Sequence, residues 1–383
     1  MSPSPVFPTN PGANCAKYRP AIDSAIRRVL DKGWYILGDE VKAFEHEFAA
    51  FVGTDHALGV ASGTDALIVA LKMLGIGPGH AVLTVSHTAV ATVAAIELAG
   101  ATPVLVDIDP LTFTMDPAAL AAVLADGRGN RALFGGAVPK AVIPVHLYGH
   151  MADMPAILAV ARQYDLPVIE DCAQAHGARL NGGGAGSHGD LAAFSFYPTK
   201  NLGAIGDGGA VTADSGSLME SGLMIREYGW RDRQSLIPGM NSRLDELQAA
   251  ILRVKLAGLA ADNRARQTIA RLYDEALADV VQTPVIRPGQ AIEHVYHQYV
   301  IQTDRRDELQ AWLREKQTIS TLIHYPLAAH QQPAYSGRHL TAGRELTHTE
   351  RACEKILSLP MYPELPLTDA RRVADAVRAF FRA

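Results

Sequence analysis

One lysine of this sequence has unusual neighbours. Lys200 lies in the stretch SFYPTKNLGAIGDGGA, after bulky aromatic residues and before glycines that let the backbone pass close to a bound group. A partly desolvated lysine has a lowered pKa and becomes a nucleophile that forms Schiff bases. The alternative is an ordinary loop lysine at the surface. The aromatic and glycine neighbours favour the chemical interpretation.

Two carboxylates end an apolar run earlier in the chain. In PVIEDCAQAHGA, Glu170 and Asp171 follow a predicted buried strand, and Gln174 comes shortly after them. A carboxylate in such a place is costly unless a cation or a strong hydrogen-bond donor meets it, and a protonated aromatic nitrogen is such a group. The alternative is that the two acids cap the next turn, and this stretch leaves both interpretations open.

A third stretch, ASGTDAL, is typical of an anion site. Gly63 and Thr64 begin a predicted helix directly after a strand, where free backbone N–H groups and the helix dipole attract negative charge. An ordinary helix cap by Ser62 or Thr64 is the alternative. Together, the lysine, the carboxylate and the anion site suggest pyridoxal 5′-phosphate (PLP). This coenzyme needs a lysine for its aldehyde, a carboxylate for its ring nitrogen and a helix N-terminus for its phosphate.

Alternating strands and helices would position these residues. Apolar runs such as AVLTVS and TPVLVDID alternate with helical patterns, which predicts an α/β fold with a mostly parallel sheet covered on both faces. From about Leu244 to Val280 the apolar spacing predicts a long helix, kinked at Gly258. We expect a large PLP-binding domain over residues 1–250, including the N-terminal segment. A smaller C-terminal α+β domain is expected over residues 251–383, linked by the long helix around 243–280.

Composition narrows the class of protein. The 383 residues carry a net charge of -5 without a visible basic cluster, which argues against nucleic acid as a partner. Cys15, Cys172 and Cys353 are widely spaced, so neither a disulfide framework nor a metal site is expected. The proline-rich start lacks a signal-peptide pattern, and the most apolar run is broken by Glu97 and Pro103. We therefore expect a cytoplasmic protein with no membrane partner.

Several segments together resemble one enzyme family. These segments are GWYILGDEVKAFEHEFAAFVG, ASGTDAL, ATVAAIELAGATPVLVDIDP, EDCAQAHGA, FSFYPTKNLGAIGDGGAV, NSRLDELQAAIL and IHYP. They resemble the DegT/DnrJ/EryC1/StrS aminotransferases, which aminate keto sugars carried on nucleotides, and the likeness runs from about residue 17 to the C-terminal helix. It implies the PLP-dependent transferase fold type I, L-glutamate/2-oxoglutarate as the amino-group couple, and a homodimer whose active sites lie at the subunit interface.

The resemblance also implies roles for individual residues. Lys200 matches the lysine that holds the coenzyme, Asp171 matches the carboxylate on its ring nitrogen, and Gln174 matches the residue beside the ring hydroxyl. The implied phosphate contacts are Gly63, Thr64, Ser195 and, from the neighbouring subunit, Asn241. The implied contacts to the sugar nucleotide are Tyr197, His324 and Tyr325.

Arg243, in NSRLD, has two interpretations. As a bidentate fork it could bind the carboxylate of the amino donor as part of the substrate site. Alternatively, it begins a helix and pairs with Asp245 or Glu246. The sequence leaves both open.

Ala89 departs from the family pattern. The family commonly has an aromatic residue here, just after a threonine, that stacks on the coenzyme, and an alanine cannot stack. Either His87 or His176 covers that face of the ring, or the face is more open.

We therefore expect a PLP-dependent aminotransferase that acts on a nucleotide-linked keto sugar. Lys200 favours transamination, because dehydratase relatives carry histidine at this position. The stretch GWYILGDEVKAFE resembles the N-terminal signature of members that aminate 3-keto sugars, which predicts a dTDP-3-keto-6-deoxyhexose with L-glutamate as donor. The alternatives are a 4-keto sugar nucleotide and a non-catalytic sensor that kept the fold. A sensor would need a fused DNA-binding domain or a decayed lysine site, and the sequence has neither.

Overall fold

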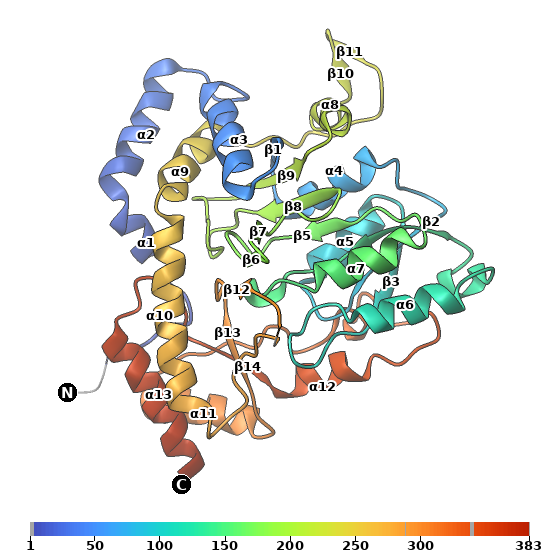
Figure 1. Cartoon of the computed structure of the whole chain (residues 1–383). Coiled ribbons are helices and arrows are strands. Elements are labelled where there is room, and N and C mark those ends of the chain that lie inside the picture. Colours follow the sequence, from blue (N-terminus) through green and yellow to red (C-terminus); the bar gives the residue numbers. More distant parts are fainter. Residues whose placement is uncertain (1–3, 288, 338–340, 383) are drawn as a thin grey trace.

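A computed structural model describes residues 4–287, 289–337 and 341–382, and its centre is a β-sheet (Figure 1). The strands follow the orders β3-β2-β4 and β5-β8-β9-β1. Parallel bridges from Val142 to Val168 and from Val145 to Asp171 join β4 to β5, so the two parts continue as one sheet. Within it, β9 alone runs antiparallel to its neighbours. The strands are β1 (His56–Val60), β2 (His80–Val85), β3 (Thr102–Val106), β4 (Val138–Ile143), β5 (Ile169–Asp171), β8 (Leu191–Ser195) and β9 (Gly209–Ala213).

Both faces of this sheet are buried, which explains the unbroken apolar runs of its strands. Alternate residues enter two separate cores, since Leu83 of β2 packs into one and Val82 packs into the other. Helices α3, α6 and α7 line the first core, and α4, α5 and α8 line the second. The predicted α/β fold with a mostly parallel, doubly covered sheet is confirmed. These helices are α3 (Asp39–Val52), α4 (Gly63–Met73), α5 (Val90–Leu98), α6 (Pro117–Asp126), α7 (Met154–Arg162) and α8 (Gly216–Ile225).

Short-range signals place the starts of several helices. The Oδ1 atom of Asp116 accepts a hydrogen bond from the Ala118 amide (2.9 Å), and α6 begins between them at Pro117. Ser62 caps α4, because its Oγ atom accepts from the Asp65 amide (3.1 Å). Such caps satisfy backbone donors that the helix itself leaves unpaired, and they fix the turns at the edge of the sheet.

A further core lies among the C-terminal elements. It is built from α10, α11, α13 and the antiparallel strands β13 and β14. Val6 belongs to this core and pairs with Ile319. The division at residue 250 stays a prediction, and the packing of Val6 adds a contact across it. The elements are α10 (Leu259–Leu277), α11 (Arg306–Gln317), α13 (Leu367–Arg382), β13 (Tyr299–Gln302) and β14 (Ile356–Leu359).

The helix expected around residues 243–280 is two helices. α9 (Glu246–Leu256) and α10 meet at Gly258, the predicted position of the kink. A Cβ atom at Gly258 would lie 2.0 Å from Oη of Tyr18, so a larger residue would displace Tyr18 from the junction. The Tyr18 hydroxyl donates a hydrogen bond to Asp262 of α10 (3.1 Å). The break therefore accommodates the N-terminal segment.

The remaining elements lie around this frame. Helix α2, from the N-terminal part, lies beside α9 (Figure 1). Within the described ranges, none of the helices is long and apolar enough to span a bilayer. The remaining helices and strands are α1 (Pro11–Lys17), α2 (Arg19–Lys32), α12 (Thr347–Lys355), β6 (Arg179–Leu180), β7 (Gly183–Gly184), β10 (Trp230–Arg231), β11 (Gln234–Ser235) and β12 (Ile292–Glu293), with 3-10 turns η1 (Arg131–Phe134), η2 (Leu147–Gly149) and η3 (Ala329–Gln331).

Candidate active site

Lys200 and Asp171 lie at the same edge of the sheet. Asp171 ends β5, and Lys200 follows the neighbouring parallel strand β8. The carboxyl ends of parallel strands meet at one edge, which is where ligands bind in α/β sheets. Burial lowers the pKa of Lys200 to about 8, and the charge of Asp171 opposes this shift. The structure thus brings together the two residues predicted to be catalytic.

Asp171 is held by two hydrogen bonds. Its Oδ2 atom accepts from Oγ1 of Thr92 in α5 (2.8 Å), and its Oδ1 atom accepts from the Ala173 amide (3.1 Å). Burial raises the pKa of Asp171, whereas these two bonds and the charge of Lys200 lower it. Because the Thr92 hydroxyl gives its proton to the carboxylate, Thr88, whose Oγ1 lies 3.0 Å away, donates to Thr92 in turn.

Thr92 is a site residue that the sequence reasoning missed. The available signal was the four-residue spacing of Thr88 and Thr92 at the start of a predicted helix; Thr88 lies two residues before α5, and Thr92 lies in its first turn. The sequence could not show which carboxylate they meet.

The loop that carries Lys200 is anchored on both sides. The Lys200 amide donates to the Tyr197 carbonyl (2.8 Å). Asn201 is buried, and its Nδ2 atom donates to Oδ1 of Asn263 in α10 (2.9 Å). A lysine held among packed groups, with a pKa of about 8, gives up its proton far more readily than a free lysine. It can therefore act as a nucleophile and as a base.

The predicted phosphate contacts meet at the start of α4. Gly63 and Thr64 are the first two residues of this helix. A Cβ atom at Gly63 would lie 2.5 Å from Cβ of Ser195, so glycine allows the helix start to abut the end of β8. The cap by Ser62 satisfies one donor and leaves others of the first turn for an anion. The cap and the anion site are therefore compatible.

Gln174 joins the two parts of the chain at this edge. Its Oε1 atom accepts from the Tyr148 amide (2.7 Å), and its Nε2 atom donates to Oη of Tyr325 (3.1 Å). The preceding residue, His324, has Nδ1 2.9 Å from Oγ of Ser358 in β14. Gln174, His324 and Tyr325 are thus assembled in one place.

Among the described residues, three other predicted site residues form no hydrogen bond with Gln174, His324 or Tyr325. Tyr197 has 53% of its surface exposed, and Asn241 is exposed as well. Arg243 is half-buried. Within residues 4–287, 289–337 and 341–382, its side chain forms no ion pair with Asp245 or Glu246, so the structural alternative for Arg243 is not observed.

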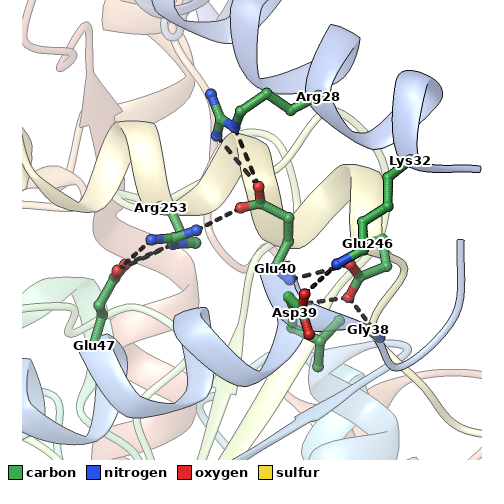
Figure 2. Close-up of polar contacts among 9 residues, drawn as sticks. Arg28, Lys32, Gly38, Asp39, Glu40, Glu47, Glu246 and Arg253 are labelled. Atoms are coloured by element: carbon green, nitrogen blue, oxygen red, sulfur yellow. Dashed lines mark hydrogen bonds and ion pairs between the residues drawn. The ribbon is translucent and has the colours of Figure 1, made fainter. Parts of the chain in front are cut away.

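Figure 2 shows how the start of α9 fixes the loop before α3. The Glu246 carboxylate accepts hydrogen bonds from the amides of Gly38 (2.8 Å), Val41 (2.8 Å) and Glu40 (3.1 Å). Arg253, further along α9, pairs with the side chain of Glu40 (2.6 Å). The loop before α3, which carries Trp34 and Tyr35, is therefore fixed to the helix that follows Asn241 and Arg243.

Comparison with known proteins decides the family. The model of the DegT/DnrJ/EryC1/StrS aminotransferase family matches residues 17–378. The chain belongs to this family. A dTDP-3-amino-3,4,6-trideoxy-alpha-D-glucose transaminase of Streptomyces venezuelae is 45% identical over 363 residues, which cover 94% of this chain and 92% of the relative. A protein of Geobacillus stearothermophilus named pleiotropic regulatory protein is 43% identical over 369 residues, 95% of each chain.

Solved structures share the fold over nearly the whole chain. DesV of S. venezuelae superposes with a TM-score of 0.91 at 42% identity, covering 100% of both chains. NtdA of Bacillus subtilis, solved with bound cofactor PMP, superposes with a TM-score of 0.85 at 29% identity, covering 96% of this chain and 82% of that chain. As a DegT/DnrJ/EryC1/StrS aminotransferase, the chain is a PLP-dependent enzyme of transferase fold type I. The predictions of family, fold, enzyme class and cofactor are confirmed.

The residues of this DegT/DnrJ/EryC1/StrS member fit PLP. A lysine with lowered proton affinity lies beside a buried carboxylate, and a glycine at the start of α4 leaves room where any side chain would collide with Ser195. When bound, PLP supplies an aldehyde for an amine and a ring that takes up the electron pair of a carbanion. We expect Lys200 to hold the aldehyde and Asp171 to hold the proton on the ring nitrogen.

Ala89 occupies the position at which the family commonly has an aromatic residue that stacks on the coenzyme. Ala89 is the residue before α5. His87 is buried, and its Nε2 atom bonds to Oη of Tyr148 (2.8 Å). The ring of His176 packs 5.6 Å from that of Phe194, and both its nitrogens lack a partner among the described residues. His87, His176 and a more open face therefore remain the alternatives for this side of the ring.

A buried network lies directly behind Asp171. Nε2 of His146 is 2.8 Å from the carboxylate of Glu170, which also accepts from the amides of His188 (2.7 Å) and Gly189 (2.7 Å). Together with Cys172, the His146 and Glu170 side chains are close enough to share a metal ion. However, Nδ1 of His146 accepts from a backbone amide, so Nε2 carries the proton and donates it to Glu170. These hydrogen bonds within the protein favour a packed core over a metal site.

Proposed function

We propose that this aminotransferase moves the amino group of L-glutamate to a dTDP-3-keto-6-deoxyhexose and releases 2-oxoglutarate. The observation that carries the proposal is the placement of Lys200 and Asp171 at one edge of the sheet, where each charge acts on the other. The sugar is supported by the S. venezuelae relative, which is named for a dTDP-3-amino sugar. The cytoplasmic location predicted from the sequence is part of the proposal.

Each site residue has a proposed task in the reaction. The Lys200 amine takes the proton from the substrate Cα, a role that suits a base with a pKa of about 8. Asp171 keeps the ring nitrogen protonated, so that the coenzyme accepts electrons. Gly63, Thr64 and Ser195 hold the phosphate at the start of α4, and Gln174 lies beside the ring hydroxyl. Contacts to the substrates are proposed for Tyr197, His324, Tyr325 and, for the carboxylate of glutamate, Arg243.

The active unit in this proposal is a homodimer. Asn241 is exposed, and among the described residues its side chain forms no hydrogen bond, which leaves it available to the phosphate of a partner subunit. Trp34 and Tyr35 are 60% and 49% exposed on the loop that Glu246 fixes. Large exposed aromatic residues of this kind support an interface.

A substrate panel tests the proposal. The purified enzyme is incubated with glutamate and dTDP-, UDP- or GDP-linked 3-keto and 4-keto sugars, and products are identified by mass. We expect turnover with a dTDP-linked 3-keto sugar and an amino group at C3 by NMR. Nitrogen at C4 would contradict the regiochemistry and leave the transaminase intact. A yellow protein that glutamate fails to bleach would contradict transamination.

A further inference from the structure

Tyr148 is a buried residue at the centre of the assembled site. It lies in η2 just after β4, and its φ of 60° is rare for a residue other than glycine. Its amide donates to Oε1 of Gln174 (2.7 Å), and its hydroxyl donates to the carbonyl oxygen of His324. One residue of the large sheet region thus contacts two predicted site residues.

The contacts of Tyr148 close into a ring. Gln174, bonded to the Tyr148 amide, donates from Nε2 to Oη of Tyr325 (3.1 Å). Tyr325 follows His324, whose carbonyl accepts from the Tyr148 hydroxyl. Tyr148 therefore holds the His324–Tyr325 pair in two ways. Its amide bonds to Gln174, which bonds to Tyr325, and its hydroxyl bonds directly to His324. A shift of residues 324–325 must break at least one of these bonds.

The proton of the Tyr148 hydroxyl has a defined direction. A carbonyl oxygen only accepts, so this proton points to His324, and Oη accepts from Nε2–H of His87 (2.8 Å). Nδ1 of His87 is then the unprotonated nitrogen, and it accepts from the thiol of Cys353 in α12 (3.5 Å). Burial lowers the pKa of His87 to about 4, which keeps the imidazole neutral and the direction fixed.

We propose that Tyr148 is a positioning residue for the sugar substrate. Its hydroxyl, oriented by His87, locks the His324–Tyr325 pair against Gln174 and so sets the part of the site that contacts the sugar nucleotide. This inference rests on the proposed substrate contacts of His324 and Tyr325. Lys200 and Asp171 keep their own anchors, Asn201 and Thr92, and are not held by Tyr148.

The test compares two tyrosine-to-phenylalanine variants of the PLP-loaded enzyme. Tyr148→Phe removes the hydroxyl that bonds to the His324 carbonyl and keeps the aromatic ring. Tyr273→Phe is the matched control, because Tyr273 is also buried and its hydroxyl also donates to one carbonyl, that of Pro360 (2.9 Å), which is not a predicted site residue. Both variants are expected to lower the melting temperature. Only Tyr148→Phe should speed hydrogen exchange in segment 321–325, by about tenfold, and raise KM for the sugar about tenfold with kcat within about twofold.

A second pair of variants tests the same inference if the Tyr148→Phe protein does not fold. His87→Gln keeps an N–H donor near Oη of Tyr148, whereas His87→Leu removes it. We expect wild-type-like exchange and KM for His87→Gln and raised values of both for His87→Leu.

The outcomes separate this inference from the proposed function. Equal exchange in the Tyr148 and Tyr273 variants, or a Tyr148→Phe enzyme whose KM does not rise despite faster exchange, overturns the positioning role. If the wild type aminates no sugar nucleotide, the proposed function fails. Exchange in segment 321–325 then still decides whether Tyr148 holds it.

Discussion

The lowered proton affinity of Lys200 predicts a measurable pH dependence of stability. The amine has a pKa of about 8 in the fold, against 10.5 for an ordinary lysine, because burial disfavours its charge. Between these values the unfolded chain binds a proton that the folded chain does not, so stability must rise with pH. From pH 7 to pH 10, proton linkage at Lys200 raises the free energy of unfolding by at most about 2.5 kcal/mol. This is an upper limit because Lys200 keeps some accessible surface.

The assay compares coenzyme-free wild type with coenzyme-free Lys200→Met. Methionine keeps much of the side-chain length and cannot titrate, so the difference between the two proteins isolates this amine from the other groups that titrate. Urea unfolding at fixed protein concentration is followed at pH 7, 8, 9 and 10. We expect the free energy of unfolding of the wild type to gain about 2 kcal/mol on the variant across this range.

Two results would refute this reasoning. A difference between the proteins that stays constant from pH 7 to pH 10 means that Lys200 titrates like a free lysine. A difference that falls with rising pH means that Asp171 outweighs burial and raises the pKa. Competitive labelling of Lys200 at each pH provides a direct check on its titration.

Three further predictions concern Asp171, Thr92 and Asn241. Asp171→Asn keeps the shape and removes the charge, so turnover should fall steeply with only a modest loss of bound PLP; near-normal rates would assign the ring nitrogen to another group. Thr92→Val removes a donor to the Asp171 carboxylate, so kcat should fall about tenfold and the acid limb of the pH profile should move to higher pH, whereas an unmoved limb would contradict this role. Mixing inactive Lys200→Ala chains with inactive Asn241→Ala chains should restore some activity in heterodimers, and verified heterodimers without activity would show that Asn241 serves its own chain.

The order of elements was predictable from the sequence because its causes are local. Residues buried on both faces of a strand must be apolar, so β2 and β3 read as unbroken apolar runs between helical patterns. Asp116 and Pro117 start α6 through contacts within a few residues. Because ligands in such sheets bind where strands end, the same pattern predicts that Lys200 and Asp171 lie at one edge of the sheet.

The partners of the site residues were decided by tertiary structure alone. Thr92 meets Asp171 across 79 positions of the chain, and Tyr148 meets His324 across 176. Neither pairing leaves a periodic signal, because a single hydrogen bond constrains two residues without requiring a pattern around either. The sequence offers His87 as a cover for the coenzyme ring, and only the tertiary structure shows that its Nε2 atom bonds to Tyr148.

The break at Gly258 shows both contributions in one place. The sequence by itself determined that a helical stretch contains a glycine, a residue of low helix propensity, and so where a kink costs little. Tertiary structure decided that the stretch does separate into α9 and α10 there, because the ring of Tyr18 occupies the space that a side chain would need. Local energies limit where a chain can bend, and contacts between distant residues select which of those places it uses.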